Sequence, residues 1–412
     1  MARKDDIIVG LDVGTHKVVA IVGEMRHDGH LEIIGVGTAP VSGMRRGVVT
    51  NVTETMEAMQ RAVHEAELMA GVTVNAVYVN VSGAHLKSFN NRGVVSIQTK
   101  EVTDQDVQRV LENAKVANIP ADRQIIHTVP QEFLVDDVEG YSDPIGICGV
   151  RLQVNVHIVT ALNAGVQNVV QCAERAGLVV LRTSAEMLAS AQAVLTEDEK
   201  ELGVALVDVG AGTTDIAIFH NGYVVHTAVL PVGGEHITND IAVGLRTPRA
   251  EAERIKLQHG CAVSALVEED EDIEVPVVGG REPIRRSRRL LCDIIEPRME
   301  EIFRFIQREI EASNFSDVLG SGIVLTGGTA LLPGVGQLGE DMFGLPVRIG
   351  YPRQVGGLHD VVNSPVYATA LGLVQQGAQE EAERTTGSKK KPNAPAGTGF
   401  WSRAREWISN AF

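Results

Sequence analysis

The chain has 412 residues, of which 44% are hydrophobic and 22% charged, and its formal net charge is −16 at pH 7. This length predicts two or more globular domains, and the acidic charge argues against nonspecific nucleic-acid binding. No apolar run approaches the roughly 20 residues needed to cross a bilayer, and four widely spaced cysteines indicate reduced thiols rather than disulfides or a metal site.

The first predicted element is an apolar strand that ends in a polar turn. Residues 8–11 lead into Asp12, Gly14 and Thr15, and a second apolar strand begins at Lys17. Glycine lets backbone N–H groups approach phosphate oxygens closely, and threonine adds a hydroxyl donor. An aspartate would repel phosphate directly, so Asp12 is expected to hold a Mg²⁺ ion through water.

The next segments predict the rest of a first half and an insertion into it. Hydrophobic spacing predicts strands at residues 31–36, 76–81 and 178–181, and helices at residues 53–70, 164–176 and 185–195. Between residues 84 and 161 the pattern changes to strands around one helix at residues 103–117. This change predicts a small α+β domain inserted into the first half.

The strand and turn then occur a second time. After residue 203 an apolar strand leads into Asp208, Gly210, Gly212, Thr213 and Thr214, and another apolar strand follows. Two copies so far apart predict a duplicated fold whose halves face each other across a cleft. The two aspartates would then hold one metal ion from opposite sides.

The second half continues with helices and a glycine-rich strand end. Residues 247–315 are expected to be mostly helical, with an acidic run at residues 268–272, a cluster of arginines, and a kink or break at Pro297. A later apolar strand ends in Gly327 and Gly328, where a purine could lie against the backbone. The last structured helix is expected at residues 364–376.

The end of the chain has a different composition. Residues 379–399 are expected to form a flexible linker. The chain from Lys389 onward carries about +4 and the rest about −20. Residues 400–412 predict an amphipathic helix whose aromatic face and arginines suit an anionic lipid surface; the membrane-facing residues are Phe400, Trp401, Arg403, Arg405, Trp407, Ile408 and Phe412. The alternative is a terminal helix that docks on its own core.

These segments, in this order, resemble the nucleotide-binding fold shared by actin, MreB, sugar kinases and heat-shock chaperone ATPases. Within that group, the insertion and the amphipathic terminus resemble the FtsA family of actin-like bacterial cell-division proteins. The resemblance implies an α/β, ribonuclease H-like duplicated fold with two lobes around a nucleotide cleft. Its expected parts are a first lobe (1–83 and 162–200), an inserted α+β domain (84–161), a second lobe (201–246 and 316–378) and a mostly helical subdomain of that lobe (247–315).

The resemblance also implies ATP and Mg²⁺ in the cleft and a role for each matching residue. Asp12 and Asp208 match the metal-associated aspartates. The matching nucleotide-binding residues are Gly14, Thr15 and Lys17 at the β-phosphate; Gly210, Gly212, Thr213 and Thr214 at the γ-phosphate; Gly233, Gly234, Glu253 and Lys256 near the ribose and adenine; and Gly327 and Gly328 beside the adenine. Glu186 matches a water-orienting catalytic residue, although a carboxylate at a helix N-terminus is favoured whatever its function.

The implied function is a scaffold, at most a weak ATPase in which nucleotide acts as an assembly switch. Such a protein would form filaments of its own copies on the cytoplasmic face of the bacterial inner membrane at the division site. It would tether the C-terminal peptide of FtsZ, and later division proteins would bind the inserted domain. The candidate FtsZ contacts are Arg285, Arg286, Arg288, Arg289 and Arg298, for which a solvated loop face is an equal alternative. A sugar-kinase-type phosphotransferase and a pilus-assembly adaptor remain alternative functions.

Overall fold

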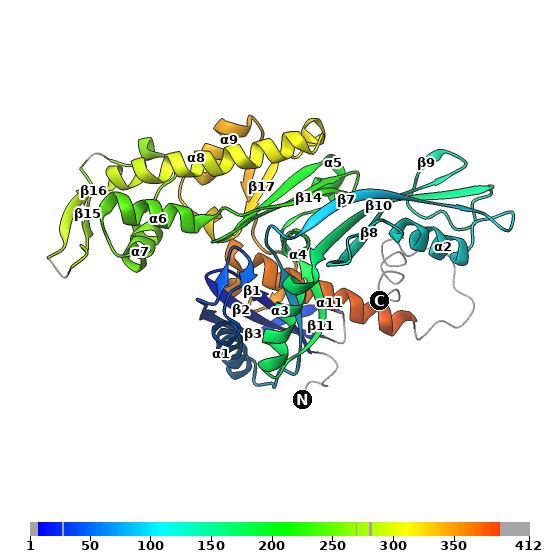
Figure 1. Ribbon diagram of the computed structural model, residues 1–412, viewed down its shortest axis with the longest axis horizontal. Coiled ribbons are helices and arrows are strands. Elements are labelled where there is room, and N and C mark those ends of the chain that lie inside the picture. Colours follow the sequence, from blue (N-terminus) through cyan, green and yellow to red (C-terminus); the bar gives the residue numbers. More distant parts are fainter. Residues whose placement is uncertain (1–6, 27–28, 269, 280–281, 388–412) are drawn as a thin grey trace.

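The computed structural model describes residues 7–26, 29–268, 270–279 and 282–387. Two α/β lobes and an inserted domain make up this part of the chain (Figure 1). The inserted domain and the α6–α8 region lie at opposite ends of the long axis of the molecule (Figure 1). No helix within the described ranges is both long enough and apolar enough to span a membrane.

The first lobe is built on a six-stranded sheet with the order β11-β6-β1-β2-β3-β19. Its strands are β1 (Ile7–Val13), β2 (Lys17–Met25), β3 (Leu31–Pro40), β6 (Ala76–Val81), β11 (Val179–Ala185) and β19 (Gly356–Gly357). Helices α1 (Val52–Ala70) and α3 (Asn163–Arg175) pack on one face, and α4 (Glu186–Val194) and α11 (Ala368–Gly387) pack on the other. A small hairpin, β4 (Met44–Arg45) and β5 (Val48–Val49), lies beside this lobe.

The second lobe has a five-stranded sheet with the order β14-β13-β12-β17-β18. Its strands are β12 (Val204–Val209), β13 (Thr214–His220), β14 (Tyr223–Leu230), β17 (Ile323–Thr326) and β18 (Val347–Ile349). Its helices are α5 (Glu197–Leu202), α6 (Gly234–Leu245), α7 (Arg249–His259), α8 (Arg288–Ala312) and α9 (Val335–Phe343), and a hairpin of β15 (Asp272–Val275) and β16 (Ile284–Ser287) lies outside the main sheet. Short helical segments complete the chain: η2 (Ser264–Leu266), η3 (Ser316–Val318), η4 (Gly328–Leu331), α10 (His359–Val362) and η5 (Pro365–Tyr367).

The two sheets have the same pairing pattern, which confirms the predicted duplication. Strand β1 is antiparallel to β2 and parallel to β6, and β12 is antiparallel to β13 and parallel to β17. In each lobe a third antiparallel strand, β3 or β14, follows the first pair. Strands β1 and β12 are buried on both faces, as expected for central strands that are apolar throughout.

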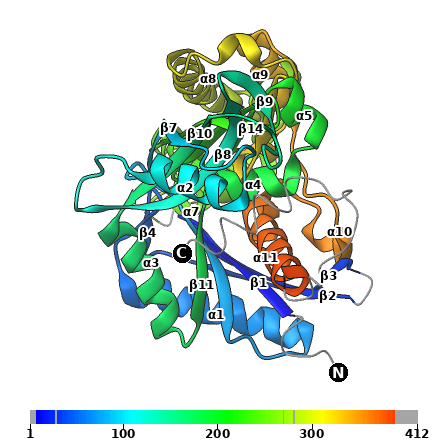
Figure 2. The same cartoon turned by 90° about the vertical axis from the view of Figure 1, so that its right-hand side faces the viewer.

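The inserted domain is a four-stranded sheet with one helix against it. Its strands are β7 (Lys87–Ser96), β8 (Arg123–Val135), β9 (Val138–Tyr141) and β10 (Arg151–Leu162), in the order β7-β10-β8-β9, and its helix is α2 (Asp104–Lys115). Apolar residues of α2 pack against alternate residues of the sheet to form a separate core. Figure 2, turned by 90° from Figure 1, views the molecule from the side of the inserted domain, with the first lobe below it in this view.

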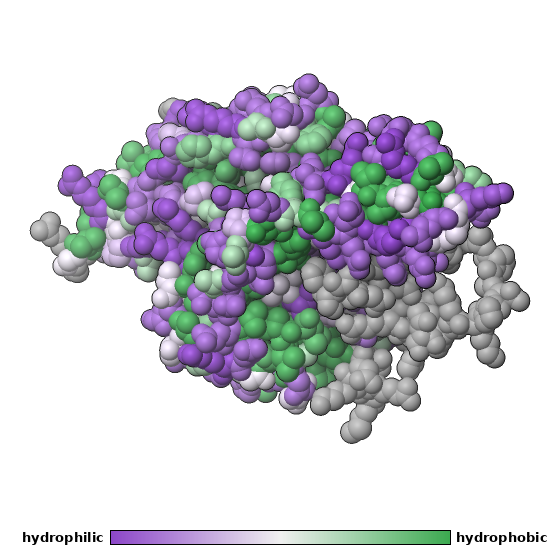
Figure 3. Space-filling view, turned by 45° about the vertical axis from the view of Figure 1, so that its right-hand side comes forward, coloured by the Kyte–Doolittle hydropathy of each residue, from purple (hydrophilic) through white to green (hydrophobic). Residues whose placement is uncertain are grey.

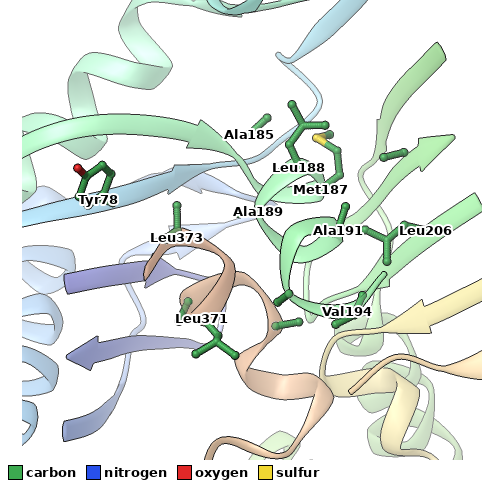
Figure 4. Packing of buried hydrophobic residues seen from close by; sticks show 14 of the residues in the cluster. Tyr78, Ala185, Met187, Leu188, Ala189, Ala191, Val194, Leu206, Leu371 and Leu373 are labelled. Atoms are coloured by element: carbon green, nitrogen blue, oxygen red, sulfur yellow. The ribbon is translucent and has the colours of Figure 1, made fainter. Parts of the chain in front are cut away.

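The core between the lobes is formed by α4 and α11. Figure 4 shows α4, with Leu188 and Val194, beside α11, with Leu371 and Leu373, next to the strands of both lobes, and all four side chains belong to one hydrophobic core. The two helices cross closely because Gly372 has no side chain: a Cβ there would overlap the backbone of Ala189. These connecting helices therefore join the two lobes through one continuous hydrophobic core.

The structure adds detail to two expectations for the second half of the chain. The section 247–315 holds the helices α7 and α8, and its charged residues form the β15–β16 hairpin, which was not expected, with Glu274 opposite Arg285. Pro297 does not break α8, which is assigned as one helix with Pro297 on its exposed side. The proline ring is tolerated there because water can reach the carbonyl that loses its hydrogen bond.

The end of the described chain also differs from the expectation. Residues 379–387 belong to α11 rather than to a linker, since Arg182 forms an ion pair with Glu380 that holds the helix against the first lobe. Strand β19 pairs with β3, and α11 packs on β1. These parts of residues 316–378 thus complete the first lobe rather than the second.

Candidate functional site

A cavity of about 350 Å³ lies between the two lobes. The ends of β1, β12 and β17 meet there, together with the start of α6 and one side of α7. It brings together most of the residues singled out from the sequence: Asp12, Gly14, Thr15, Lys17, Glu186, Asp208, Gly210, Thr213, Gly234, Glu253, Lys256, Gly327 and Gly328. Segments more than three hundred residues apart therefore form one site.

The turns after β1 and β12 have the same backbone closure. The N–H of Gly14 donates to the carbonyl of Lys17 at 3.0 Å, and the N–H of Gly210 donates to that of Thr213 at 2.9 Å. The amides inside each turn make no hydrogen bond to another described residue; they are those of Thr15, His16, Ala211 and Gly212. Consecutive N–H groups of this kind form a receptor for an anion.

The two turns also touch each other. A Cβ on Gly212 would lie 2.6 Å from the Thr15 hydroxyl, so a side chain there would separate the turns. The Thr15 hydroxyl accepts a hydrogen bond from the N–H of Gly47 at 3.1 Å. The paired turns are thus close enough for one polyphosphate to contact both.

Four buried carboxylates lie at the base of the cleft, and the pKa of each is raised. Burial and the nearby Asp208 raise the pKa of Asp12 to about 7, and burial raises that of Asp208 to about 6. Burial and Asp208 raise the pKa of Asp215 to about 8. Burial and the three aspartates raise the pKa of Glu186 well above its ordinary value. Groups whose pKa is shifted by burial and by nearby charges cluster at functional sites.

Each of these carboxylates has a neutral hydrogen-bond donor. Asn80, at the end of β6, donates through Nδ2 to Asp12 at 2.8 Å and to Glu186 at 3.0 Å. Ser82 donates to both oxygens of Asp215, at 3.0 and 2.9 Å. Ser190 of α4 donates to Asp208 at 2.6 Å. These donors fix where the carboxylates point.

A divalent cation fits the chemistry of this donor set. Asp12 and Asp208 lie on opposite lobes and line the same cavity, and burial raises the pKa of both, so a nearby positive charge would favour their ionised forms. Lys17 supplies some of it, although burial lowers the pKa of its ammonium group. Among the described residues, no group of three His, Cys, Asp or Glu side chains is placed to hold a metal ion; binding mainly through water stays a prediction.

The other end of the cavity is built by glycines and one ion pair. Gly327 has a φ of 83° and lies against the Asp208 carboxylate and the backbone of Val209, so no other residue type suits this position. Lys256 donates to Glu253 at 2.7 Å and to the carbonyl of Gly234 at 3.2 Å. This pair joins α7 to the start of α6 on the wall of the cavity.

Three predicted nucleotide-binding residues do not line the cavity themselves. Gly212, in the second turn, packs against Thr15 of the first turn. The hydroxyl of Thr214 donates to the carbonyl of Val232 at 2.8 Å and is buried, which is a structural role. Gly233 precedes α6, where a Cβ would lie 2.6 Å from the carbonyl of Gly210.

The arginines singled out as a partner surface have different surroundings. Arg285 and Arg286 lie exposed on β16. Arg288 forms an ion pair with Glu271, and Arg298 forms ion pairs with Asp240 and Glu301. Arg289 is partly buried at the start of α8. The residues predicted to meet the membrane, from Phe400 to Phe412, lie outside the described ranges.

Sequence reasoning missed Asn80, Ser82 and Asp215 as site residues. Asp215 had a signal in the sequence, because it belongs to the second turn motif. Asn80 lies near the end of β6 and Ser82 directly after it, and a lone polar residue at the end of a strand does not show what it faces. Since β6 is parallel to β1 in the sheet, the ends of both strands lie at the same edge.

The fold and the cleft define a class, that of actin-like proteins with two lobes of similar α/β fold. Structures with this fold include the PilM–PilN type IV pilus biogenesis complex (TM-score 0.63, 17% identity, 90% of this chain and 98% of that chain). Another is MreB5 of Spiroplasma citri bound to ADP (TM-score 0.54, 16% identity, 93% and 99%). These likenesses show the fold alone.

Sequence comparisons narrow the class to one family. A model of the cell division protein FtsA matches residues 205–372, and a model of the SHS2 domain inserted in FtsA matches residues 83–160. The chain is 46% identical to the cell division protein FtsA of Pseudomonas aeruginosa and 40% identical to that of Escherichia coli strain K12, each over 98% of both chains. The chain belongs to the FtsA family of actin-like bacterial cell-division proteins, and the sugar-kinase and pilus-adaptor alternatives are set aside.

Proposed function

We propose that the cleft binds ATP with Mg²⁺ and that the bound nucleotide controls assembly of this cell-division protein into filaments. One observation carries the proposal: two turns with the same closure, whose inner amides have no hydrogen-bond partner among the described residues, face one cavity that Gly327 and Gly328 also line. MreB5, which shares the fold, has been solved with ADP and with AMPPNP. Mg²⁺ would offset the charge of the phosphates and of Asp12 and Asp208.

The site favours a switch with at most weak ATPase activity. Glu186 lines the cavity and would orient water, but burial and three nearby aspartates raise its pKa. A carboxyl group that holds its proton is a poor acceptor of a proton from water. Slow hydrolysis suits a nucleotide whose main effect is on the shape of the protein.

The nucleotide proposal is tested by titrating the full chain with ATP and Mg²⁺ in a calorimeter. Asp208→Asn and Lys17→Ala should each weaken binding about tenfold or more, because each removes a charge from a buried site. Lys115→Ala, at the end of α2 in the inserted domain, is the matched control and should bind like the wild type. No binding by the wild type, or equal binding by all four proteins, would overturn the proposal.

We further propose that the chain is held on the cytoplasmic face of the inner membrane at the division site by residues 400–412. The aromatic and basic composition of this segment supports the proposal. One such tail should bind weakly, and a filament carrying many tails should bind firmly. Full-length protein should sediment with vesicles that contain anionic lipid, and a chain ending at Gly387 should stay in solution. Equal sedimentation of the two would contradict the assignment.

The proposed partner on the β15–β16 side is the acidic C-terminal peptide of FtsZ. Arg285 and Arg286 are the better candidates, since Arg288 and Arg298 already pair with carboxylates of their own chain. Replacing both Arg285 and Arg286 by Ala should weaken peptide binding about tenfold, measured by fluorescence anisotropy. Arg304→Ala, on the exposed side of α8, is the control. Unchanged affinity of the double variant would remove these two arginines from the proposal.

Later division proteins are proposed to bind the inserted domain. Its surface exposes apolar side chains, among them Val116 (78% exposed) and Val150 (74% exposed). Green areas interrupt the hydrophilic surface over this domain in Figure 3. Exposed apolar groups gathered on one domain are typical of protein-binding surfaces.

A further inference from the structure

The segment that leads from the first lobe into the inserted domain contacts the buried carboxylates at the base of the cleft. Strand β6 ends at Val81 and β7 begins at Lys87, so Asn80, Ser82 and Gly83 lie at the root of the inserted domain. Asn80 and Ser82 are only 1% and 4% exposed. Polar side chains this deeply buried are costly unless they make specific hydrogen bonds.

Asn80 uses both ends of its amide on the first lobe. Its Oδ1 accepts a hydrogen bond from the N–H of Val13 at 2.7 Å, next to the first turn. Its Nδ2 donates to Asp12 and to Glu186, so one amide holds two carboxylates from different elements. Without this donor, the two anions would face each other with less compensation.

Ser82 makes the corresponding contact to the second lobe. Its hydroxyl reaches both oxygens of Asp215, on β13, and lies 3.4 Å from the hydroxyl of Thr213 in the second turn. Gly47 packs against this root, since a Cβ there would lie 2.8 Å from the N–H of Gly83. The root therefore contacts Val13, next to the first turn, through Asn80, and the second turn through Ser82.

The body of the inserted domain is attached to the second lobe as well. Ser88 donates to the carbonyl of Thr227 at 2.8 Å, Asn90 to that of Val225 at 3.0 Å, and Gln131 to that of Val224 at 2.7 Å. All three acceptors lie on β14, the edge strand of the second lobe's sheet. A domain inserted into the first lobe is thus held by the second.

We propose that Asn80 and Ser82 are positioning residues that connect the cleft carboxylates to the inserted domain, so that occupancy of the cleft changes how that domain is held on β14. The inference rests on the proposed binding of nucleotide. A ligand that moves Asp12 and Thr213, which line the cavity, changes the contacts of Asn80 and Ser82 and, through them, the position of the root of the inserted domain. By linkage, a partner that displaces the inserted domain changes the affinity for nucleotide by the same factor.

Hydrogen exchange of the full chain, with and without ATP and Mg²⁺, tests the inference. In the wild type, nucleotide should change the exchange rates of amides in β7 and β14 by about threefold or more. Ser82→Ala removes one oxygen atom, and Asn80→Ala removes the amide. Both variants, saturated with nucleotide, should lose most of this change in β7 and β14.

Two further variants make the result specific. Thr128→Val removes a buried hydroxyl in β8 that has no hydrogen-bond partner among the described residues, and it should respond to nucleotide like the wild type. Ser82→Cys keeps a weaker donor and should restore part of the response. Because Ser82→Ala is such a small change, the test holds even if Asn80→Ala fails to fold.

The possible outcomes distinguish failure of this inference from failure of the proposed nucleotide binding. A wild type that binds no nucleotide overturns both. A wild type that binds but shows no change in β7 and β14 overturns the inference alone. The same holds if Ser82→Ala binds nucleotide and keeps the full exchange response, because Ser82 would then have only a local structural role.

Discussion

Asp12 is a buried carboxylate whose ionised form is disfavoured by its surroundings. It is 8% exposed, accepts a hydrogen bond from Asn80, and has Asp208 as a neighbour across the cleft. Its pKa of about 7 lies above the ordinary value of 3.8 because burial and Asp208 disfavour the ionised form. The folded protein therefore takes up a proton here that the unfolded chain releases, and stability falls as pH rises from about 4 to about 7.

Asp12→Asn should make the empty protein more stable and less able to bind. At pH 8, without nucleotide or metal, the variant should unfold with a free energy roughly 1–3 kcal/mol higher than the wild type. At pH 4 the difference should be small, because the folded wild-type carboxyl keeps its proton and the unfolded one, with a pKa of about 3.8, is close to half protonated. Urea unfolding at the two pH values measures this, and calorimetry should show at least tenfold weaker binding of ATP with Mg²⁺.

Asp360→Asn on the surface is the control for this prediction. It should change stability little at either pH. If Asp12→Asn were less stable than the wild type at pH 8, or if its advantage were the same at both pH values, the carboxylate would not be destabilising.

Among single residues, the sequence predicts a place in the cleft for those whose chemical type recurs at the same position in both turn motifs. Asp12 and Asp208 follow equivalent strands in two motifs, so both could be assigned to one cleft. Asn80 and Ser82 could not, because a lone polar residue after a strand shows nothing about what faces it. Only the pairing of β6 with β1 brings the Asn80 amide between Asp12 and Glu186.

Helix α8 shows a conflict between local propensity and packing. Leu291, Ile295, Met299, Ile302 and Ile306 are buried in the core of the second lobe. This apolar side keeps the chain helical through Pro297, which lacks an N–H and crowds the preceding turn. The burial of these side chains outweighs the local cost of Pro297, the residue for which the sequence alone predicts a kink or break.

Pro297→Ala should therefore stabilise the protein. The residue is exposed, so the core is unchanged, and the new N–H can donate to the carbonyl of Asp293. We expect the free energy of unfolding to rise by about 1–3 kcal/mol. Thermal unfolding monitored by circular dichroism measures it. A lower midpoint would mean that the bend imposed by proline is required for packing.

The β15–β16 hairpin marks the limit of element prediction. Each of its two strands has four residues, and several of these are charged. On β15 only Ile273 and Val275 are buried. Strands this short give no clear alternation over several residues. What stabilises them is contact with the rest of the lobe and cross-strand pairs such as Glu274 with Arg285, neither of which composition reveals.

Across the whole molecule, His157 connects the inserted domain to the second lobe. Its Nδ1 donates to the Asn90 oxygen at 2.8 Å, and its Nε2 accepts from the hydroxyl of Thr227 at 2.9 Å. Burial, with smaller effects of His226 and His127, lowers its pKa to about 3. The unfolded chain binds a proton here below about pH 6.5 and the folded one does not, so acid weakens the fold.

His157→Gln should make this connection less sensitive to acid. Between pH 7 and pH 5 the wild type should lose about 2 kcal/mol of unfolding free energy that the variant keeps. Urea unfolding at both pH values gives the difference, with His64→Gln on the exposed side of α1 as the control. Equal losses in wild type and His157→Gln would show that this histidine is protonated within the folded protein.

Duplication, cleft and insertion could all be predicted, because each has a repeated or contrasting pattern in the sequence. The return of the chain to the first lobe could not. Strand β19 is two residues long, and α11 is apolar in a way that fits either lobe. In the structure α11 packs closely on β1 at Gly10, whose missing side chain leaves room for the backbone of Ala370.

This return has a consequence for how the protein is made. A ribosome releases β1 long before α11, yet Ile8 and Ile21 share one core with Leu371 and Val374. Until α11 emerges, one face of the first sheet has only α4 to cover part of it, and the rest is open to chaperones or to aggregation. A truncated product of early termination would carry both phosphate-facing turns and still lack a finished first lobe.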